Sequence, residues 1–595
     1  MMKKIKQAAA AVISAAMLLS IIPAANAAEE EKPSYPAPNF KLYQTDYYTD
    51  EYVIAGYTVQ DFGAKGDGVT DDTKAFQDAI DAAAAAGGCT IWVPEGRYAI
   101  KGNLVMKQGV SINGEIDTPG RDKAVKGTIL QAYAGRGSIE GDPFIMMQPV
   151  TGIHDLAIWY PEQEADNIQP YPPAIQMGDP SVWGNDYVTV DNIEFVNAYL
   201  GYKNNPNMGG CPIVRNIYGT PLKSGIRIDS LADVGRIENC DFSPLYWENS
   251  GLPGAPSDKD SHRSYIYENG IAYEMSRNDW SYGRWLTADR YGVGFYALNS
   301  FCEGAWNGES RISNMYPNGE NYGMKFSNCH IGVAIEDTSN SGMVITHTEI
   351  DNCENGFVAR NTMASKISLI GWTINATDNA ILNEGTGQVM MQEMDIESGK
   401  VSLSAGYASM LNCKFNNAAP QITLGKYSNA SILGSTFKET KTIENNSVLT
   451  VTVDDTPVEM EPTPEFPQVN VLEVKPPRAV MYNAKDFGVK IDGVTDDAPA
   501  IQKALDKAAA DGGGIVFLPP GFYGIKSELT VPSNVEFRGA LDTGTMPRKN
   551  GSTLEIYHGK GQEGGATIHL QEKSTIRGIC VDYPEQDYND PIKFP

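Results

Sequence analysis

The sequence has few histidines, few basic residues and only one long apolar run, and each shortage excludes a class of protein. It holds 6 His, without metal-ligand spacing and without a zinc or EF-hand pattern, so we expect no metal and no cofactor. Calcium bound to an acidic surface is the alternative that the sequence leaves open. Lys and Arg number 47 against 74 Asp and Glu, and the net charge of −27 argues against nucleic acid as a partner. The same charge favours neutral glycans over anionic ones as binding partners.

The single long apolar run lies at residues 8–25. It follows the basic segment KKIK at residues 3–6 and ends at the small-residue sequence Ala-Asn-Ala at residues 25–27. This pattern is typical of a secretory signal peptide over residues 1–27, and a retained membrane helix is the weaker alternative. No other stretch approaches the ~20 apolar residues of a membrane span. We therefore expect a secreted, extracellular protein that has no membrane contact after signal removal; its oligomeric state stays open.

The eight Cys residues show no spacing typical of a disulfide framework. Four of them follow an Asn, and three of those recur in the strand pattern described below. We interpret these four as buried thiols: Cys240, Cys329, Cys353 and Cys413.

One block of sequence occurs twice. Residues 61–72 read DFGAKGDGVTDD and residues 486–497 read DFGVKIDGVTDD, and VPEGRYAIKGNL at 93–104 matches LPPGFYGIKSEL at 518–529. Such a repeat indicates one domain followed by the beginning of a second copy. The second copy stops at Pro595, so we expect it to be incomplete.

Short β-rich runs, separated by Gly, Asn, Asp and Ser, follow the first block as far as about residue 455. An element of the form "small or apolar, any residue, then Ile or Phe" recurs every 19–24 residues, ending at Ile331, Ile350, Ile374, Ile396, Phe415 and Phe437. This step is the length of one coil of a parallel β-solenoid, in which each coil buries its inward residues on its neighbours. One position of the element favours a left-handed turn and holds Asn192, Asn216, Asn239, Asn328 and Asn412.

Helical periodicity appears once in each copy, at residues 72–86 and 497–511, where it predicts an amphipathic helix. We expect the first helix to cover the open edge of the first coil. The predicted organisation is then a signal peptide at 1–27, a lead segment at 28–55, a first β-helix at 56–455 with an insertion at 243–316, a Pro-rich linker at 456–478, and the start of a second β-helix at 479–595.

The DFGAKGDGVTDD block, followed by a helix, Gly-Gly and a VPEGRY strand, resembles the entry motif of the pectate-lyase superfamily. The resemblance implies an all-β fold, a right-handed parallel β-helix with an N-terminal capping helix. Two such motifs joined by a Pro-rich linker resemble the tandem layout of the family-55 glycoside hydrolases, which are exo-β-1,3-glucanases. The motif sets of polygalacturonases and of classical pectate lyases are absent, and the family-55 catalytic acid lies in the second helix. The resemblance therefore assigns a catalytic role to no particular residue of this chain.

Paired carboxylates occur at Asp71 and Asp72, and again at Asp496 and Asp497. An acid/base dyad is one interpretation. The favoured one is structural, because both pairs fall at the start of a predicted helix, where the helix dipole and free amides attract anions.

The middle residue of each recurring element should point outward, and three of these residues form a candidate catalytic column. Glu194 and Asp241 stand two coils apart with Tyr218 between them, so their Cα atoms should lie roughly 9–10 Å apart at about 4.8 Å per coil. That is close to the ~6.5–9.5 Å between the carboxyl groups of an inverting glycosidase. An ordinary solvated face is the alternative. The column is expected to continue through His330, Glu349, Thr373, Asp395 and Lys414.

The insertion at 243–316 is rich in Trp and Tyr, which is the composition of a glycan groove because sugar rings stack on aromatic side chains. A small core of its own is the alternative. The candidate substrate-binding residues are Tyr218, Tyr246, Trp247, Trp280 and Trp285.

Together these features predict a secreted carbohydrate-active protein. The leading hypothesis is a glycoside hydrolase acting on a neutral polysaccharide such as a β-1,3-glucan, with Glu194 and Asp241 as the acid/base pair in undetermined order. A polysaccharide lyase of the pectate type is an alternative that requires Arg or Lys near the scissile uronate, whereas the column's one base, Lys414, lies far from Asp241. The remaining alternative is a carbohydrate-binding or surface-adhesion protein.

Overall fold

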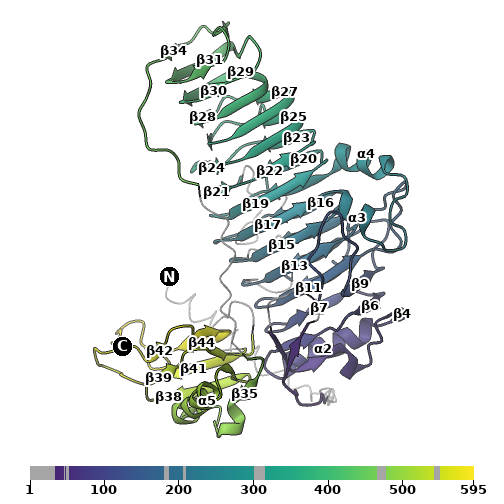
Figure 1. The fold of residues 1–595 in the computed structure, drawn as a ribbon, viewed down its shortest axis with the longest axis vertical. Coiled ribbons are helices and arrows are strands. Elements are labelled where there is room, and N and C mark those ends of the chain that lie inside the picture. The colour runs from purple at the N-terminus through teal and green to yellow at the C-terminus, as the bar shows by residue number, and fades with distance from the viewer. Residues whose placement is uncertain are drawn as a thin grey trace, which may run out of the picture. The chain divides into compact units, whose positions relative to one another are not determined.

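Parallel strands stacked coil upon coil make up most of the chain (Figure 1). In the computed structural model β13 (Thr189–Phe195) pairs in parallel with β11 (Gly152–Trp159) on one side and with β15 (Ile213–Gly219) on the other. The stack runs from β3 (Tyr57–Thr58) to β34 (Val451–Asp454). The described residues are 34–45, 47, 52–179, 186–204, 209–300, 315–465, 478–541 and 550–594, so the predicted signal peptide lies outside them.

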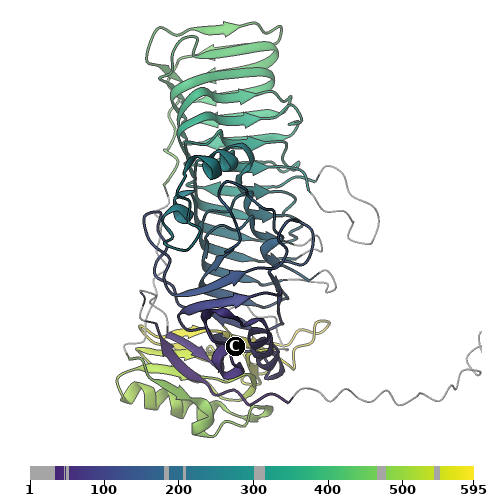
Figure 2. The ribbon, with the colours of Figure 1, turned by 90° about the vertical axis from the view of Figure 1, so that its right-hand side faces the viewer.

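Each coil contributes to three ladders of parallel strands, here called the first, second and third faces. His154, Asp191 and Arg215 are register partners on the first face, whereas Ala157, Glu194 and Tyr218 are register partners on the second. The third face is built by β12 (Pro173–Met177), β14 (Leu200–Asn204), β16 (Ser224–Ile228), β18 (Ile271–Met275), β20 (Val293–Ala297) and β23 (Ile331–Ile335). Figure 2 shows these coils stacked above one another. The predicted parallel β-helix is therefore confirmed for this part of the chain.

A sharp corner joins the first face to the second, and asparagine residues occupy its turn position. Asn192, Asn216, Asn239 and Asn412 have φ between 51° and 55°, the left-handed conformation that Asn tolerates better than most residues. The Asn239 side chain donates a 2.6 Å hydrogen bond to Oδ1 of Asn216, one coil below. The predicted asparagine position is thus confirmed for these four residues.

Asn328 does not belong to that position, and this prediction is wrong. It lies at the opposite end of the second face, after β22 (Lys325–Ser327), where Asn352 of the next coil donates a 2.8 Å hydrogen bond to its Oδ1. The two corners carry the same Asn-Cys dipeptide, so the sequence pattern alone does not separate them.

The two predicted amphipathic helices are present as α2 (Thr73–Ala85) and α5 (Ala498–Ala510). Helix α2 packs its apolar side chains on β5 (Thr90–Trp92) and β7 (Leu104–Met106). Two further helices, α3 (Leu245–Asn249) and α4 (Asp260–Asn269), lie in the predicted insertion at 243–316. The bounds of that insertion are wrong, because β18, β19 (Tyr282–Asp289) and β20 lie within them and pair in parallel with the neighbouring coils. Sequence periodicity misses α4 because only His262 and Ile266 are buried in it.

The paired carboxylates at the helix starts are structural, and the first member of each pair makes the expected contact. Asp71 accepts a 3.1 Å hydrogen bond from the Thr73 amide of α2, and Asp496 accepts a 3.3 Å hydrogen bond from the Ala498 amide of α5. The second member of each pair bonds elsewhere. Asp72 is buried, and its two oxygens accept hydrogen bonds of 2.7 and 3.1 Å from the amides of Lys65 and Gly66 in the preceding turn rather than from amides of α2. Asp497 repeats this with the amides of Lys490 and Ile491. The block DFGAKGDGVTDD therefore forms a turn whose backbone amides are bound by the side chain of its last aspartate.

The C-terminal segment also forms parallel ladders. One joins β35 (Met481–Asn483), β37 (Gly514–Phe517), β40 (Val535–Arg538) and β43 (Thr575–Arg577); another joins β36 (Asp492–Asp496), β38 (Gly521–Ile525), β41 (Ser552–Ile556) and β44 (Ile579–Asp582); and a third joins β39 (Leu529–Val531) and β42 (Ile568–Leu570). These ladders enclose a core with α5 that includes Ile501, Leu505 and Tyr523.

The four cysteines expected to be buried thiols are all buried and free. Burial raises the pKa of the Cys413 thiol to about 12, so it carries its proton at neutral pH and reacts poorly. Within the described ranges, no helix is long and apolar enough to cross a membrane.

Candidate functional site

The second face brings the predicted catalytic column together. Glu194 on β13 is the register partner of Tyr218 on β15, and Tyr218 is the partner of Asp241 on β17 (Arg236–Phe242). The next partner is Thr287 on β19 (Tyr282–Asp289). The predicted spacing of Glu194 and Asp241, two coils apart, is therefore confirmed.

The continuation of the column differs from the prediction at one place. Thr287 is the partner of Lys325, which is in turn the partner of Glu349. His330 was expected at that position, but it follows the Asn328 corner and lies beyond the second face. Beyond Glu349 the register runs through Thr373, Asp395 and Lys414, as predicted.

Asp241 is the centre of a saturated hydrogen-bond cluster. Arg121 donates to both carboxylate oxygens, from Nε at 2.8 Å and from Nη2 at 2.5 Å. The Tyr246 hydroxyl donates at 2.9 Å and the Thr287 hydroxyl at 2.5 Å. Four donor groups on three side chains, two of them on one guanidinium, anchor this carboxylate. This geometry favours a positioning role for Asp241 over proton transfer.

Arg121 comes from a segment that crosses over the second face. The side chain of Asn249 in α3 donates a 2.8 Å hydrogen bond to the Arg121 carbonyl, and the Val125 amide donates to the Ser250 carbonyl at 2.9 Å. Segment 117–126 and α3 therefore cover the column. The premise that a lyase would find no Arg or Lys close to Asp241 is wrong, because Arg121 contacts it and Lys325 also lies in the column.

This anchoring predicts a measurable coupling between Arg121 and Asp241. Their side chains are 35% and 20% exposed, so the pair is only partly desolvated. We expect Arg121→Met to lower the free energy of unfolding by about 1–3 kcal/mol, because it leaves the Asp241 charge without its main partner. The double variant with Asp241→Asn should lose less than the sum of the single changes in urea unfolding. Additive losses would contradict the anchoring role.

Glu194 is buried, whereas the sequence predicted an outward, solvated side chain. Its exposed fraction is 3%, and among the described residues no hydrogen bond or ion pair to its carboxyl is found. Burial alone raises the pKa of Glu194 to about 8, so the group is protonated at neutral pH. The expected exposure is wrong because segment 117–126 and α3 lie over this face.

The predicted aromatic groove is not assembled. Tyr246 and Trp247 are 2% and 0% exposed, in a small core that Trp247 shares with His262 of α4, so they cannot stack on a sugar. Trp280 is 54% exposed in the loop between the third and first faces, whereas Trp285 lies at the corner between the first and second faces, next to Tyr322. The alternative of a separate core for the insertion is the correct one for Tyr246 and Trp247.

The third face carries a second polar column that the sequence analysis missed. Lys203 on β14, Arg227 on β16, Glu274 on β18 and Tyr296 on β20 are successive register partners, here called the third-face column. At about 4.8 Å per strand it spans roughly 14 Å. Each member is the third residue of a recurring triplet of Gly or Ala, a large apolar residue and a polar residue, as in Gly225-Ile226-Arg227. This triplet is the sequence pattern that could have indicated the column.

Charged and phenolic groups in this column are held in place by hydrogen bonds. Arg227 donates to both oxygens of Glu274, at 2.8 and 3.0 Å, and the Glu274 side chain is 1% exposed. The Tyr296 hydroxyl donates a 3.0 Å hydrogen bond to Glu336, which also accepts from the Asn299 amide at 3.1 Å. Burial, reinforced by Glu336, raises the pKa of Tyr296 to about 12. Because Lys203, Arg227 and Tyr296 are partly exposed, a ligand can reach them.

The column combines two functions that acid–base chemistry on a charged sugar needs. Lys203 and Arg227 present cations that can hold an anionic group. Tyr296 and Glu336 form a phenol–carboxylate pair through which a proton can move. Among the described residues, no group of His, Cys, Asp and Glu has the arrangement of a metal site.

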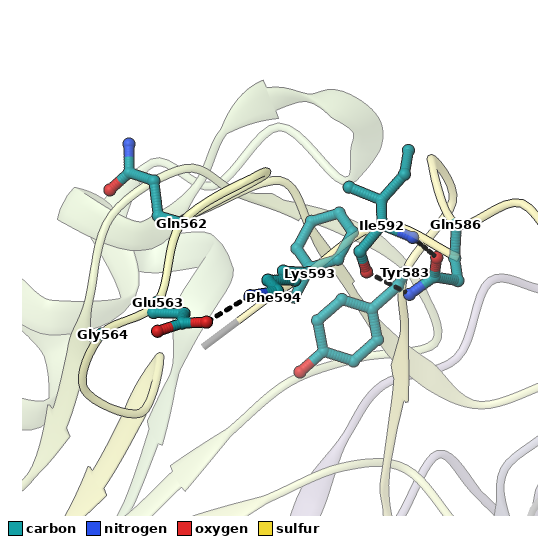
Figure 3. A pocket seen from close by; sticks show the side chains of 8 residues that line it. All are labelled: Gln562, Glu563, Gly564, Tyr583, Gln586, Ile592, Lys593 and Phe594. Carbon is teal, nitrogen blue, oxygen red and sulfur yellow. Dashed lines mark hydrogen bonds and ion pairs between the residues drawn. The ribbon is translucent and has the colours of Figure 1, made fainter. Parts of the chain in front are cut away.

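A cavity of about 600 Å³ lies among the C-terminal residues (Figure 3). Its polar groups bond to one another: Lys593 pairs with Glu563, and the Gln586 side chain makes hydrogen bonds of 2.6 and 2.8 Å with the backbone of Ile592. The Tyr583 and Phe594 rings also pack together, with centroids 4.9 Å apart. These contacts hold the segment together. The Gln562 side chain and the Tyr583 hydroxyl also line the cavity, without a hydrogen bond to the other residues drawn.

Comparison with known proteins gives matches in both copies of the repeated block. The model of the family "Rhamnogalacturonase A/epimerase, pectate lyase-like" matches residues 57–162 and 481–583. Alginate lyase 7 of Azotobacter vinelandii is 52% identical over 65 residues, which are 10% of this chain and 8% of that protein. Plasmin and fibronectin-binding protein A of Streptococcus pneumoniae is 42% identical over 73 residues, which are 11% of this chain and 10% of that protein. The chain thus spans about a tenth of the length of these curated relatives.

Among solved structures, the A-module of the mannuronan C-5 epimerase AlgE6 of Azotobacter vinelandii matches with a TM-score of 0.40 and 15% identity. This match covers 68% of the present chain and 100% of that module.

Proposed function

We propose that this chain, a parallel β-helix protein of the pectate lyase-like superfamily, acts on a uronate-containing polysaccharide by moving the proton on the sugar carbon next to the carboxylate. The observation that carries the proposal is the third-face column, in which Lys203, Arg227, Glu274 and Tyr296 lie on four adjacent strands. Lyases and C5-epimerases of uronates both begin with this proton transfer, so the column supports either outcome.

In this proposal Lys203 and Arg227 bind the uronate carboxylate, and their positive charge stabilises the additional charge that develops when carbon 5 loses its proton. Glu274 orients Arg227 through the two hydrogen bonds between them. Tyr296 takes the proton from carbon 5 while its own hydroxyl proton passes to Glu336, 3.0 Å away. A proton from solvent water delivered to the opposite face of carbon 5 gives the epimer. Breaking of the bond between carbon 4 and its linking oxygen, which takes up a proton from water, gives an unsaturated uronate instead.

One further point supports a uronate, and one opposes it. Alginate lyase 7 and several mannuronan C5-epimerases are among the matched relatives, although those matches cover only about a tenth of this chain. The net charge of −27 opposes a polyanion, so binding depends on direct contacts of Lys203 and Arg227 with the carboxylate. Binding should therefore weaken as salt screens these contacts.

The experiment that tests the proposal is a comparison of substrates and products. The full chain is incubated with polymannuronate, polygalacturonate and laminarin. Absorbance of an unsaturated product or a changed ratio of C5 epimers, on a uronate alone, supports the proposal. New reducing ends on laminarin, without change to the uronates, would instead support a hydrolase. Binding of a glycan without any product would support the carbohydrate-binding or adhesion alternative.

A glycoside hydrolase acting through Glu194 and Asp241 is the second candidate. The observation that favours it is the raised pKa of Glu194, about 8, since a general acid must carry its proton at working pH. This candidate requires segment 117–126 to move and Arg121 to leave Asp241, because both carboxyl groups are otherwise covered.

The proposal also includes the organisation of the chain. Residues 1–27 direct export, so the protein acts outside the cell. Helices α2 and α5 each cover the open first coil of a β-helix, and residues 456–478 link the two. Residues 479–595 begin the second β-helix, an assignment supported by their three parallel ladders.

A further inference from the structure

A groove of about 700 Å³ runs along the corner between the third and first faces in the later coils. Four successive coils contribute Lys366, Gln388, Tyr407 and Asn429, which are register partners on β26 (Lys366–Ile370), β28 (Gln388–Gln392), β29 (Asp395–Leu411) and β31 (Ile422–Leu433). At about 4.8 Å per coil these positions span roughly 14 Å. The groove therefore follows the direction of the stack and is long enough for several sugar rings.

Small residues form the floor of this groove. Ala405 is the register partner of Tyr427, Gly406 follows it on the same strand, and Gly387 lies on the coil before. A Cβ atom at Gly387 would lie 2.4 Å from the Ser365 carbonyl oxygen. The corner therefore admits no side chain there, and the backbone itself forms the bottom of the groove.

Five polar side chains of the groove make no hydrogen bond with the described residues. No hydrogen bond of the Asn340, Gln388, Tyr407, Tyr427 or Asn429 side chain is found in the described part of the chain. Many other asparagines of the stack, Asn239 and Asn352 among them, donate to a neighbouring coil. Five neutral polar side chains that gather in one groove and keep their hydrogen-bonding capacity can serve a ligand.

Two tyrosines supply apolar ring surface beside these groups. Tyr427 is 58% exposed, and the Lys426 ammonium lies 5.2 Å from its ring centroid. Tyr407 is partly exposed on the neighbouring coil. Exposed rings flanked by amides match the two sides of a pyranose, since its C–H face packs on aromatic carbon and its hydroxyls pair with amides.

We propose that this groove is an ancillary binding site for a neutral polysaccharide chain, separate from the third-face column. Its lining contains one cation, Lys366, and no Asp or Glu. A polyuronate carries a carboxylate on every ring, which one lysine cannot pair, so a neutral chain fits better. Without a carboxyl group the groove holds a glycan and does not cleave it. The inference stands whether or not the proposed proton transfer is correct.

The test is titration calorimetry of the full chain with β-1,3-gluco-, β-1,4-gluco- and β-1,4-manno-hexaose, and with an oligomannuronate of the same length. At least one neutral hexaose should bind, with an affinity that changes little between low and high salt. The double variant Tyr407→Ala/Tyr427→Ala should weaken that binding by roughly tenfold or more. Tyr407→Phe/Tyr427→Phe, which keeps both rings, should retain most of it.

Tyr588→Ala is the matched control, because Tyr588 is 95% exposed and lies outside the groove. It should bind the hexaoses as the parent chain does. Three results would overturn the inference: no neutral hexaose binds, binding survives the double alanine change, or the oligomannuronate alone is bound and loses its affinity in that variant. Each variant's thermal unfolding is measured alongside, so that a loss of fold is not mistaken for a loss of site.

Discussion

Replacing Tyr296 by phenylalanine is expected to lower turnover of a polyuronate by about 10²–10⁴-fold, the usual contribution of a positioned general acid or base. The change removes one oxygen, so the ring stays on β20 and only the path from substrate to Glu336 is broken. Affinity for the polymer should change little, because Lys203 and Arg227 remain. The measurement is the initial rate over a range of substrate concentrations, which separates kcat from KM.

Tyr282→Phe is the control for this change. Tyr282 is also partly exposed, but it lies on β19 at the first face, away from the column. Its variant should keep the parent rate. Equal rates for Tyr296→Phe and Tyr282→Phe would remove Tyr296 from the reaction, whereas a large rise in KM with unchanged kcat would make it a binding residue.

Replacing Glu194 by glutamine is expected to remove a strong pH dependence of stability. The folded-state pKa of Glu194 is about 8 against an ordinary 4.5, so the folded protein binds this proton more tightly than the unfolded chain does. Its contribution is fully present below about pH 4.5 and is lost as the pH rises through 8. At ~1.4 kcal/mol per pKa unit the loss reaches up to about 5 kcal/mol.

Urea unfolding at pH 5 and at pH 8.5 measures this effect. Glu194→Gln should be more stable than the parent at pH 8.5, and its advantage should shrink or reverse at pH 5. Glu349→Gln, in the same column with a side chain 52% exposed, is the control and should follow the parent at both values. If Glu194→Gln also follows the parent, Glu194 is not buried as described.

The fold could be predicted from the sequence because a β-helix repeats the same strands and corners in every coil, so the same residue types recur. Inward residues such as Phe195 and Phe242 recur at one position, and Asn192, Asn216 and Asn239 mark the corner that each coil must turn. Prediction failed where two corners share one pattern. Asn328 and Asn239 both precede a cysteine, but they stand at opposite ends of the second face.

The candidate site could be predicted only in part. Strand register follows from the local sequence repeat, whereas the burial of the site depends on segments that lie far away in the sequence. The spacing of Glu194, Tyr218 and Asp241 follows from the repeat. Their burial depends on Arg121, which is 120 residues from Asp241 in sequence and reaches it through a segment without any repeat pattern. The same limit applies to Trp247, which is buried on α3 between β15 and His262 of α4, both far from it in the repeat pattern.

The third-face column was missed for a different reason. Its members differ in chemical type, so Lys203, Arg227, Glu274 and Tyr296 do not look like one repeated position. The position becomes visible from the preceding residues, which are small and then large apolar in every coil. A functional column in a β-helix is thus indicated by the regularity of its neighbours rather than by its own residues.

Proton nuclear magnetic resonance of a polyuronate incubated with the full chain in D₂O tests the central claim most directly. Removal of the proton on carbon 5 exchanges it for deuterium in an epimerase and gives an unsaturated carbon in a lyase, so the H5 signal falls in both cases. The account predicts that this signal is lost with the parent chain and persists with Tyr296→Phe. An H5 signal that stays constant on polymannuronate and polygalacturonate, while laminarin gains reducing ends, would contradict it.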